Sequence, residues 1–224
     1  MQEQDTQDGP SGTAQAVPRH RHLRRLLVVA LVLAVVVGGV VWWVDQGRHY
    51  FFPKNWGVVE EGRVYRSGRI HEGLVEDTLA DHGIRVIVDL AASDAVDDDF
   101  RAERAASQKL GIRRVEMLNL NGYGSGAPEE YAQALHEILK AKDAEEPILV
   151  HCAGGSERTG GVFAIYRMLW HGWTGERAWE EYKSYRDKPP ENLHLPEFVN
   201  ANLPAILDRL EALGVPVDRP DPLP

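Results

Sequence analysis

The residues between Pro147 and Gly160 carry the clearest chemistry in the chain. They read PILVHCAGGSERTG, in which Arg158 follows Cys152 by six positions. The apolar run from Ile148 to Val150 predicts a short buried strand, the glycines predict a tight loop, and the apolar residues after Gly160 predict a helix. A thiol and a guanidinium would then lie at the two ends of one strand-to-helix loop. This arrangement predicts a pocket for an anion with a nucleophile beside it.

Each part of this loop suits phosphoryl transfer. A glycine-containing loop at a helix N-terminus directs backbone amides and the positive end of the helix dipole at a phosphate. Arg158 can bind two phosphate oxygens through its planar fork. A free cysteine titrates near ~8.5, but such surroundings lower that value to roughly 3.5–7.5, so Cys152 is expected to be an attacking thiolate. Thr159 is expected to donate its hydroxyl to the sulfur. The expected phosphate-binding residues are Ala153, Gly154, Gly155, Ser156, Glu157 and Arg158.

The string HCAGGSERTG resembles the signature loop of the cysteine-dependent phosphatases, the protein tyrosine and dual-specificity phosphatase superfamily. Within it, the chain is most similar to the bacterial dual-specificity-like group, which includes relatives acting on inositol phosphates. GRVYRSG from Gly62 and GIRVIVDL from Gly83 are similar to that group's opening strands. The resemblance implies hydrolysis of phosphate monoesters through a phosphocysteine on Cys152, with His151 in a supporting role and no metal or organic cofactor. It leaves phosphorylated proteins, lipids and inositol phosphates open as substrates.

One departure from the family pattern concerns the general acid. The family places an aspartate on the loop after the strand that is expected to end at Leu120, but no Asp occurs between Phe100 and Lys142. Glu157 is the carboxyl nearest in sequence to the nucleophile and becomes the candidate acid, with Glu129 and Glu130 as further donors. The alternative is that Glu157 orients a backbone amide. Ser156 also replaces the basic residue that close relatives carry, which lowers the positive charge available for a polyanionic inositol phosphate.

Two other function classes share parts of this pattern. A pseudophosphatase would bind phosphate without turnover; the missing aspartate favours it, and the intact Cys152 and Arg158 oppose it. An oxyanion reductase or sulfur transferase also uses Cys-x5-Arg. The Arg-Thr-Gly ending and the single cysteine of the chain count against that class. A cysteine that is merely a small core residue would not require His151, Arg158 and Thr159 at these offsets.

Residues Leu26 to Val44 form an apolar stretch of 19 residues without a charge. About 20 such residues span a bilayer as a helix, and tryptophans such as Trp42 and Trp43 suit its interface. The run is longer than a typical signal-peptide core and lacks a small-residue cleavage site, so we expect an uncleaved signal anchor. Arginines are more frequent before the span than after it, which predicts a cytoplasmic N-terminus and a phosphatase domain outside the cytoplasm. That domain would be periplasmic if the cell is Gram-negative and extracellular otherwise.

Composition limits the remaining possibilities. The 224 residues carry a net charge of -9, and acidic residues outnumber basic ones by 30 to 19 from Asn55 onward, which argues against a nucleic-acid surface. The nine histidines include no metal-binding spacing, so no metal site is predicted. Asp97, Asp98 and Asp99 are interpreted as a solvated helix start. Arg66 and Ser67 are possible ligand contacts, although Arg66 is more simply explained as holding a loop by pairing with a carboxylate.

Strand and helix patterns alternate after Asn55, which predicts an α/β domain with a mainly parallel central sheet and helices on both faces. Strands are expected near 58–65, 85–90, 113–120 and 148–150. Helices are expected near 71–82, 98–110, 128–141, 159–171, 174–186 and 196–213, the last one restarted at Pro204. The predicted organisation is a disordered cytoplasmic tail with a basic end at 1–25, a transmembrane anchor at 26–44, a juxtamembrane linker at 45–54, the phosphatase domain at 55–214 and an irregular tail at 215–224.

Overall fold

A computed structural model describes residues 19–45, 47–92, 97–122, 124–185 and 194–224. The chain divides into two compact units between Gly47 and Arg48. The predicted tail at 1–25 falls largely outside the described residues. Its last seven residues, 19–25, belong instead to the first helix, because their arginines and leucine are good helix formers that continue directly into the apolar run.

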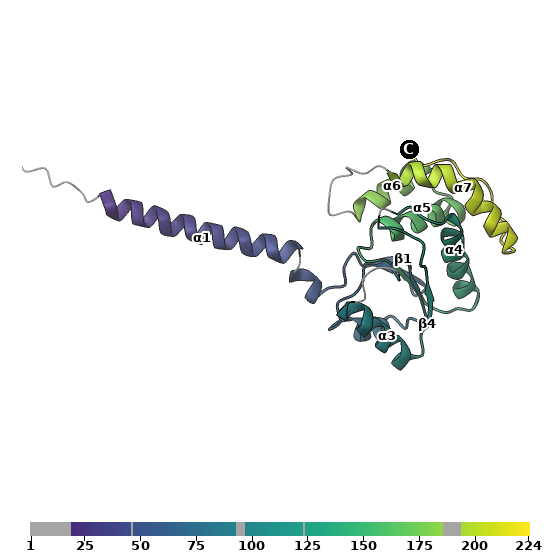
Figure 1. Ribbon diagram of the computed structural model, residues 1–224, viewed down its shortest axis with the longest axis horizontal. Coiled ribbons are helices and arrows are strands. Elements are labelled where there is room, and N and C mark those ends of the chain that lie inside the picture. The colour runs from purple at the N-terminus through teal and green to yellow at the C-terminus, as the bar shows by residue number, and fades with distance from the viewer. Residues whose placement is uncertain (1–18, 46, 93–96, 123, 186–193) are drawn as a thin grey trace, which may run out of the picture. The chain divides into compact units, whose positions relative to one another are not determined.

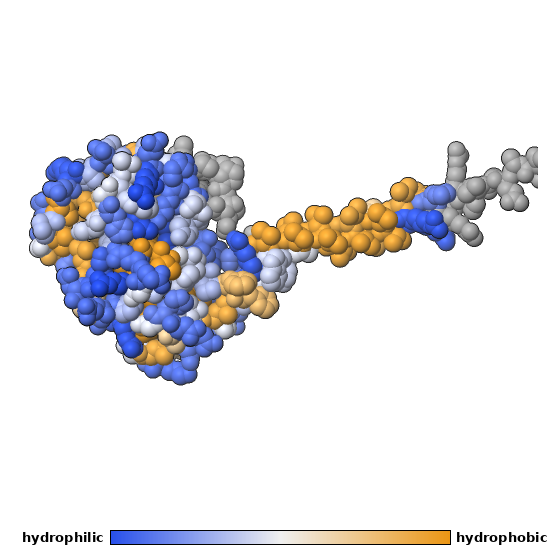
Figure 2. Space-filling model, turned by 180° about the vertical axis from the view of Figure 1, so that it is seen from behind, coloured by the Kyte–Doolittle hydropathy of each residue, from blue (hydrophilic) through white to orange (hydrophobic). Residues whose placement is uncertain are grey.

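The first unit is the helix α1, Arg19–Asp45. Within its segment His22–Val44, the most apolar window of 18 residues has a mean hydropathy of 2.8 and none of that window is buried, so the segment is long and apolar enough to cross a membrane. Figure 2 shows this helix as a continuous hydrophobic surface, whereas the second unit is covered mainly by hydrophilic residues. A short 3₁₀-helix, Gly47–Tyr50, follows.

The second unit is built on a five-stranded mixed sheet in the order β1-β2-β5-β3-β4. The strands are β1 Gly57–Glu60, β2 Val64–Ser67, β3 Val86–Asp89, β4 Arg113–Glu116 and β5 Ile148–His151. All neighbours are parallel except the β1–β2 hairpin at one edge. The expectation of a mainly parallel sheet is confirmed, and β5 lies at its centre with a parallel strand on each side.

Helices cover both faces of this sheet, as Figure 1 shows. Alternate strand residues point to opposite faces. Tyr65, Ile87 and Leu149 pack toward α2 (Val75–Asp81) and α3 (Asp98–Leu110). Val64, Val88 and Val150 belong to the larger core cluster on the other face. The helices of that face are α4 (Pro128–Asp143), α5 (Glu157–His171), α6 (Gly175–Ser184) and α7 (His194–Ala212).

The end of β4 and the start of α2 differ from the boundaries expected from the sequence. β4 was expected to reach Leu120 but ends at Glu116, because β3, its neighbour in the sheet, ends opposite it at Asp89. Leu120 instead forms an isolated bridge with Gly126, which closes the following loop on itself. The helix expected from His71 begins at Val75, since the His71 ring accepts a hydrogen bond from the Gly73 amide and holds a turn there.

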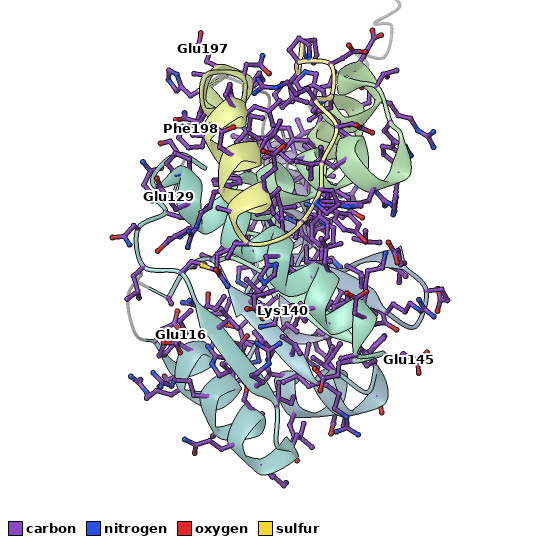
Figure 3. The ribbon with its side chains drawn as sticks, turned by 90° about the vertical axis from the view of Figure 1, so that its right-hand side faces the viewer. Glu116, Glu129, Lys140, Glu145, Glu197 and Phe198 are labelled. Atoms are coloured by element: carbon purple, nitrogen blue, oxygen red, sulfur yellow. The ribbon has the colours of Figure 1, made fainter. Side chains whose placement is uncertain are left out.

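The C-terminal helix α7 is continuous through Pro204, so the expected restart there is wrong. Proline removes one helical hydrogen bond, but apolar residues on both sides of it, among them Leu203 and Ile206, are buried against the core. In Figure 3, Phe198 of α7 lies beside the start of α4, and its ring centroid is 5.6 Å from that of Tyr131. The residues after Gly214 form neither helix nor strand, yet Leu223 is buried and paired with Asn200.

Candidate active site

The last residues of the three central strands lie side by side at the carboxyl edge of the sheet. Ser67 of β2 and Asp89 of β3 both lie opposite His151 of β5 in the parallel register. The loop Cys152–Ser156 leaves the sheet at this edge and runs directly into α5. Open α/β sheets bind ligands at this edge, so the strand-loop-helix order predicted from the sequence places the loop where a ligand site is expected.

The loop is held from outside by three hydrogen bonds to successive carbonyl groups. The Ala153 carbonyl accepts from the Arg69 amide at 3.2 Å. The Gly154 carbonyl accepts from Asn55 Nδ2 at 2.8 Å, and the Gly155 carbonyl accepts from Arg66 Nη2 at 2.9 Å. Because the amide on the other side of each planar peptide points the opposite way, the following amides are turned toward the inside of the loop.

This shape depends on glycine at two positions. Gly155 has a φ of 75°, and a Cβ there would lie 2.4 Å from the Gly68 amide nitrogen. A Cβ on Gly68 would lie 2.9 Å from the Gly154 carbonyl. The loop therefore packs backbone against backbone on the end of β2, which explains the glycines in both the signature loop and the YRSG stretch.

Cys152 lies at the base of this loop and is 2% exposed. Its sulfur accepts a hydrogen bond from the Gly155 amide at 3.1 Å. Burial raises the pKa of the thiol, but the hydroxyl and amide of Thr159, the Arg158 charge and the Gly155 amide lower it further, so the net pKa of Cys152 lies below its ordinary value. The geometry favours a thiolate at the position predicted for the nucleophile.

Two buried arginines lie beside the loop and have different roles. Arg158 is in the first turn of α5, is 3% exposed, and donates from Nη1 to the Leu90 carbonyl at 3.1 Å. Arg66 donates to the loop carbonyl of Gly155, and its guanidinium stacks 3.6 Å from the centre of the Tyr185 ring. Arg66 thus holds the loop as expected, but the expected carboxylate partner is wrong, because the carbonyl of the loop itself is the acceptor.

A buried group of charges lies under the loop, on the α2–α3 face of the sheet. His151 Nε2 is 3.2 Å from Glu103 Oε2 and 4.0 Å from Asp89 Oδ1. Arg114 pairs with the same two carboxylates. Burial lowers the pKa of His151, but the charges of Glu103 and Asp89 outweigh it and raise that pKa to about 9. His151 is therefore a cation at neutral pH, and its supporting position next to Cys152 is fixed by ion pairs.

The same three residues have the composition of a small metal site. One ligand atom each from Asp89, Glu103 and His151 lie within 4.8 Å of one another. Both carboxylates, however, already face the cations Arg114 and His151. A metal ion would add positive charge next to a protonated histidine, so we assign these residues to a buried ion-pair network.

The carboxyl groups considered as acids lie in three different settings. Glu157 accepts a hydrogen bond from the Tyr182 hydroxyl of α6. Glu130 accepts from the Leu118 and Asn119 amides, so it anchors the loop after β4. Glu129 is exposed at the start of α4, where Figure 3 labels it. Of the three, only Glu157 adjoins the phosphate loop, as the first residue of α5.

Some residues that build the site carried no recognisable sequence signal. Asn55 donates to the carbonyl of Gly154, which lies 99 residues later in the sequence. Glu103 comes from the helix α3, and Arg114 comes from the edge strand β4. The backbone at Asn55 has a positive φ of 48°, a conformation that asparagine tolerates better than most residues. The residue type is therefore the one local hint at this position. The interpretation of the acidic run at 97–99 is confirmed: Asp97 caps α3 by accepting from the Phe100 amide.

Comparison with known proteins agrees with this geometry. Residues 58–195 match the family model described as PTP-SAK, Swiss Army Knife protein, DSP-PTPase phosphatase domain. Over 72 residues, or 32% of the chain, the sequence is 33% identical to the dual specificity protein phosphatase TpbA of Pseudomonas aeruginosa. That match spans only 33% of the length of TpbA.

Solved structures share the fold. The crystal structure of P. aeruginosa TpbA superimposes with a TM-score of 0.55 at 21% identity, covering 72% of this chain and 91% of that one. The catalytic core of the PP-IP phosphatase SIW14 from S. cerevisiae gives 0.54 at 17% identity, covering 75% and 98%. The family match extends over more than half of the chain and includes the whole phosphate loop. The chain is therefore a member of the PTP-SAK family of dual-specificity-type phosphatase domains.

Proposed function

We propose that the chain is a membrane-anchored cysteine phosphatase that hydrolyses phosphate monoesters. The observation that carries this proposal is the loop itself. Its carbonyls are tied outward by Arg69, Asn55 and Arg66, so the amides that follow them are turned inward, where the Gly155 amide already donates to the Cys152 sulfur. A phosphate bound above that sulfur would accept from these inward-facing amides. Preorganised amides of this kind stabilise charge on the equatorial oxygens, which is usually the largest catalytic term.

The reaction has two steps in this pocket. The Cys152 thiolate attacks phosphorus in line, so that an S–P bond forms while the ester P–O bond breaks. The leaving oxygen takes a proton from Glu157, the proposed acid. A water oxygen then attacks the phosphocysteine and gives a proton to the Glu157 carboxylate, which restores the acid; the S–P bond breaks, and inorganic phosphate leaves as the thiolate is restored. Through both steps Arg158 and the loop amides hold the phosphoryl oxygens.

The direct test measures hydrolysis of an aryl phosphate by the full chain, its Cys152→Ser variant and its Arg158→Lys variant. Cys152→Ser should abolish turnover and still bind inorganic phosphate, since the loop amides remain. Arg158→Lys should lose both binding and rate, because a point charge replaces a bidentate fork. Turnover by Cys152→Ser would remove Cys152 from the nucleophile role, and unchanged kinetics in Arg158→Lys would contradict the pocket.

A phosphate-binding module without turnover is the second candidate. It is favoured by the loop between Asn119 and Ala127, which has no aspartate, and by Glu130, whose carboxyl is engaged by loop amides. An activated aryl phosphate separates the two candidates, because its leaving group barely needs an acid. Phosphate binding without any release of the aryl alcohol would establish the binding module.

For the substrate, we propose a phosphoprotein, with phosphotyrosine as the first class to test. TpbA has been crystallised with pTyr, whereas PTPMT1 has been crystallised with PI(5)P. Inositol phosphates and phosphoinositides are therefore the alternative class. Ser156 offers no positive charge for additional phosphates, which favours a substrate with a single phosphate. A panel of phosphotyrosine peptide, phosphoserine peptide, phosphoinositide and inositol phosphate would rank these classes.

The anchor and its orientation are also proposals. The 23-residue apolar segment His22–Val44 supports a single span. Four arginines, at 19, 21, 24 and 25, precede the uncharged stretch Leu26 to Val44, whereas Arg48 and Lys54 follow it closely, which favours a cytoplasmic N-terminus. A reporter that is active only outside the cytoplasm, fused after Pro224, should give signal. Signal from a cytoplasm-dependent reporter alone would overturn this orientation.

A further inference from the structure

Three consecutive aromatic residues form an exposed patch at the start of the second unit. Tyr50, Phe51 and Phe52 are 53%, 62% and 64% exposed. Among the described residues from Arg48 onward, the other exposed large hydrophobics are Val58 and Leu118, which are separated in sequence from the three and from each other. Single exposed apolar residues are normal on a protein surface, whereas a contiguous group marks an interaction site. We call these three residues the aromatic patch.

The aromatic patch is fixed to the folded domain. The Tyr50 ring lies 4.4 Å from the His71 ring, centroid to centroid. The amides of Phe51 and Phe52 both donate to the Arg48 carbonyl, which closes a turn. The side chains are therefore presented by a hydrogen-bonded turn that is continuous with the domain.

Chain length limits what can cover this patch. Tyr50 follows Val44, the last residue of the candidate span, by six positions, so it can lie at most about 20 Å from the end of the span. The polar headgroup layer on each side of a bilayer is itself roughly 5–8 Å thick. If α1 crosses a membrane, the aromatic patch stays within reach of the headgroup layer, where aromatic rings are favoured.

Charge favours the same partner. Residues 48–59 contain Arg48 and Lys54 and no acidic residue, although acidic residues outnumber basic ones by 30 to 19 from Asn55 onward. An anionic bilayer surface would attract this segment and repel the acidic remainder of the domain. Aromatic rings flanked by cations are thus matched to a lipid surface.

The segment that follows the patch also supports the phosphate loop. The Lys54 carbonyl accepts from the Gly68 amide at 2.7 Å. Asn55 Nδ2 donates to the Gly154 carbonyl of the loop at 2.8 Å and to the Tyr185 carbonyl at 3.2 Å. Only Pro53 and Lys54 separate Phe52 from Asn55. Whatever holds the patch in place also holds a residue that fixes the loop.

We propose that the aromatic patch docks onto the headgroup layer of the bilayer that α1 crosses, and that this contact keeps the phosphate loop next to the membrane surface. The inference rests on the membrane anchoring proposed above. It adds a second attachment between protein and lipid, made by the catalytic domain itself.

The test uses the full chain in vesicles of phosphatidylethanolamine and phosphatidylglycerol. Cys152→Ser removes the single native thiol, so that an environment-sensitive fluorophore can be attached at Phe51→Cys, or at Phe52→Cys in a second preparation. The matched control carries the label at Asp143→Cys, the exposed last residue of α4, two positions before Glu145, which Figure 3 labels. This segment leads into the start of β5, whereas the phosphate loop follows the end of β5. We expect blue-shifted emission and quenching by headgroup-labelled nitroxide lipids at positions 51 and 52, and neither effect at position 143.

Each other outcome has a defined meaning. If the chain resists alkaline extraction but the labels at 51 and 52 are neither shifted nor quenched, the docking inference is overturned and the anchor stands. Equal quenching at 51 and 143 would also overturn it, because the contact would not belong to the patch. Release of the chain from the vesicles at alkaline pH would overturn the anchor, and the docking inference with it.

Discussion

His151 Nε2 lies 3.2 Å from Glu103 Oε2, and both side chains are fully buried. His151 is the last residue of β5 and precedes the nucleophile, whereas Glu103 reaches it from α3, on the face of the sheet opposite α5. Arg114 holds the same glutamate from the edge strand. The residue next to Cys152 is therefore fixed by charges that lie outside the phosphate pocket, which separates the support of the loop from its chemistry.

Glu103→Gln should destabilise the fold in a pH-dependent manner. The folded-state pKa of His151 is raised from 6.5 to about 9, so its contribution is full below pH 6.5 and is lost as the pH rises through 9. The pKa of Glu103 is lowered from 4.5 to about 2, against the effect of burial and by the charge of His151, so its contribution is full above pH 4.5 and is lost as the pH falls through 2. Both contributions are full between pH 4.5 and pH 6.5, so the loss of unfolding free energy should be greatest there. It should amount to about 3–5 kcal/mol, because one partner of a buried pair is removed.

Urea unfolding of this variant at several pH values measures the effect. Glu116→Gln is the matched control, since Glu116 also pairs with Arg114 but its side chain is 30% exposed. Its effect should be smaller and should not track the titration of His151. A Glu103→Gln protein with wild-type stability near pH 5.5 would show that the pair contributes nothing to the fold.

Thr159→Val should raise the pKa of the Cys152 thiol. The Thr159 hydroxyl is buried, and its proton is available to the Cys152 sulfur as charge develops there. Together with its amide it offsets the effect of burial on the pKa of Cys152. A hydrogen bond to a charged group contributes about 1.5–3 kcal/mol, which corresponds to roughly one or two pKa units.

The pH dependence of alkylation of Cys152 by iodoacetate reports this pKa. In Thr159→Val the alkylation profile should move to higher pH, whereas Ser156→Ala, which removes a different hydroxyl in the same loop, should leave it in place. Identical profiles for Thr159→Val and the wild-type chain would exclude the hydroxyl as a stabiliser of the thiolate.

Asn55→Gly should weaken phosphate binding while preserving the backbone. Glycine tolerates the φ of 48° at this position, so the substitution removes mainly the amide that donates to the Gly154 and Tyr185 carbonyls. Each lost hydrogen bond costs about 1 kcal/mol, so inhibition by inorganic phosphate should weaken by roughly fivefold or more. Asn55→Asp, which cannot donate to a carbonyl, should show at least the same loss. Unchanged inhibition in both variants would mean that the loop keeps its shape without this clamp.

The sequence was sufficient for features that depend on local order. Ile148 to Val150 lie in a buried strand as expected. The helix that was expected to begin at Thr159 begins two residues earlier, at Glu157. The central sheet is mainly parallel as expected, because β2, β3, β4 and β5 are joined by helical crossovers, which return the chain in the same direction. Local patterns of apolar residues and glycines determine these elements.

The supports of the loop depend on contacts between distant parts of the chain. Asn55 and Gly154 are 99 residues apart, and Arg66 and Gly155 are 89 residues apart. Side chains that bond to backbone carbonyls leave no periodic signal, because the partner can be any residue. The carboxylate expected beside Arg66 was wrong for this reason. Glu103 was not recognised because a glutamate in a helix rich in charged residues is normally solvated.

The missing aspartate leads to the last prediction. Leaving-group protonation is worth about 10²–10⁴-fold, so an active enzyme with a poor leaving group needs a donor. Glu157 is the proposed donor, although one of its oxygens accepts a hydrogen bond from Tyr182. If the carboxyl supplies the proton, Glu157→Gln should slow alkyl phosphates by about 10²-fold or more, and activated aryl phosphates far less.

Two matched variants separate this role from a structural one. Tyr182→Phe removes the hydrogen bond to Glu157 and keeps the carboxyl, so alkyl phosphate turnover should survive in it. Glu129→Gln removes an exposed carboxyl from the start of α4 and should leave the ratio of alkyl to aryl rates unchanged. If Glu157→Gln and Tyr182→Phe instead slow both substrate types equally, the contact between α5 and α6 shapes the loop, and the proton comes from water or from another group.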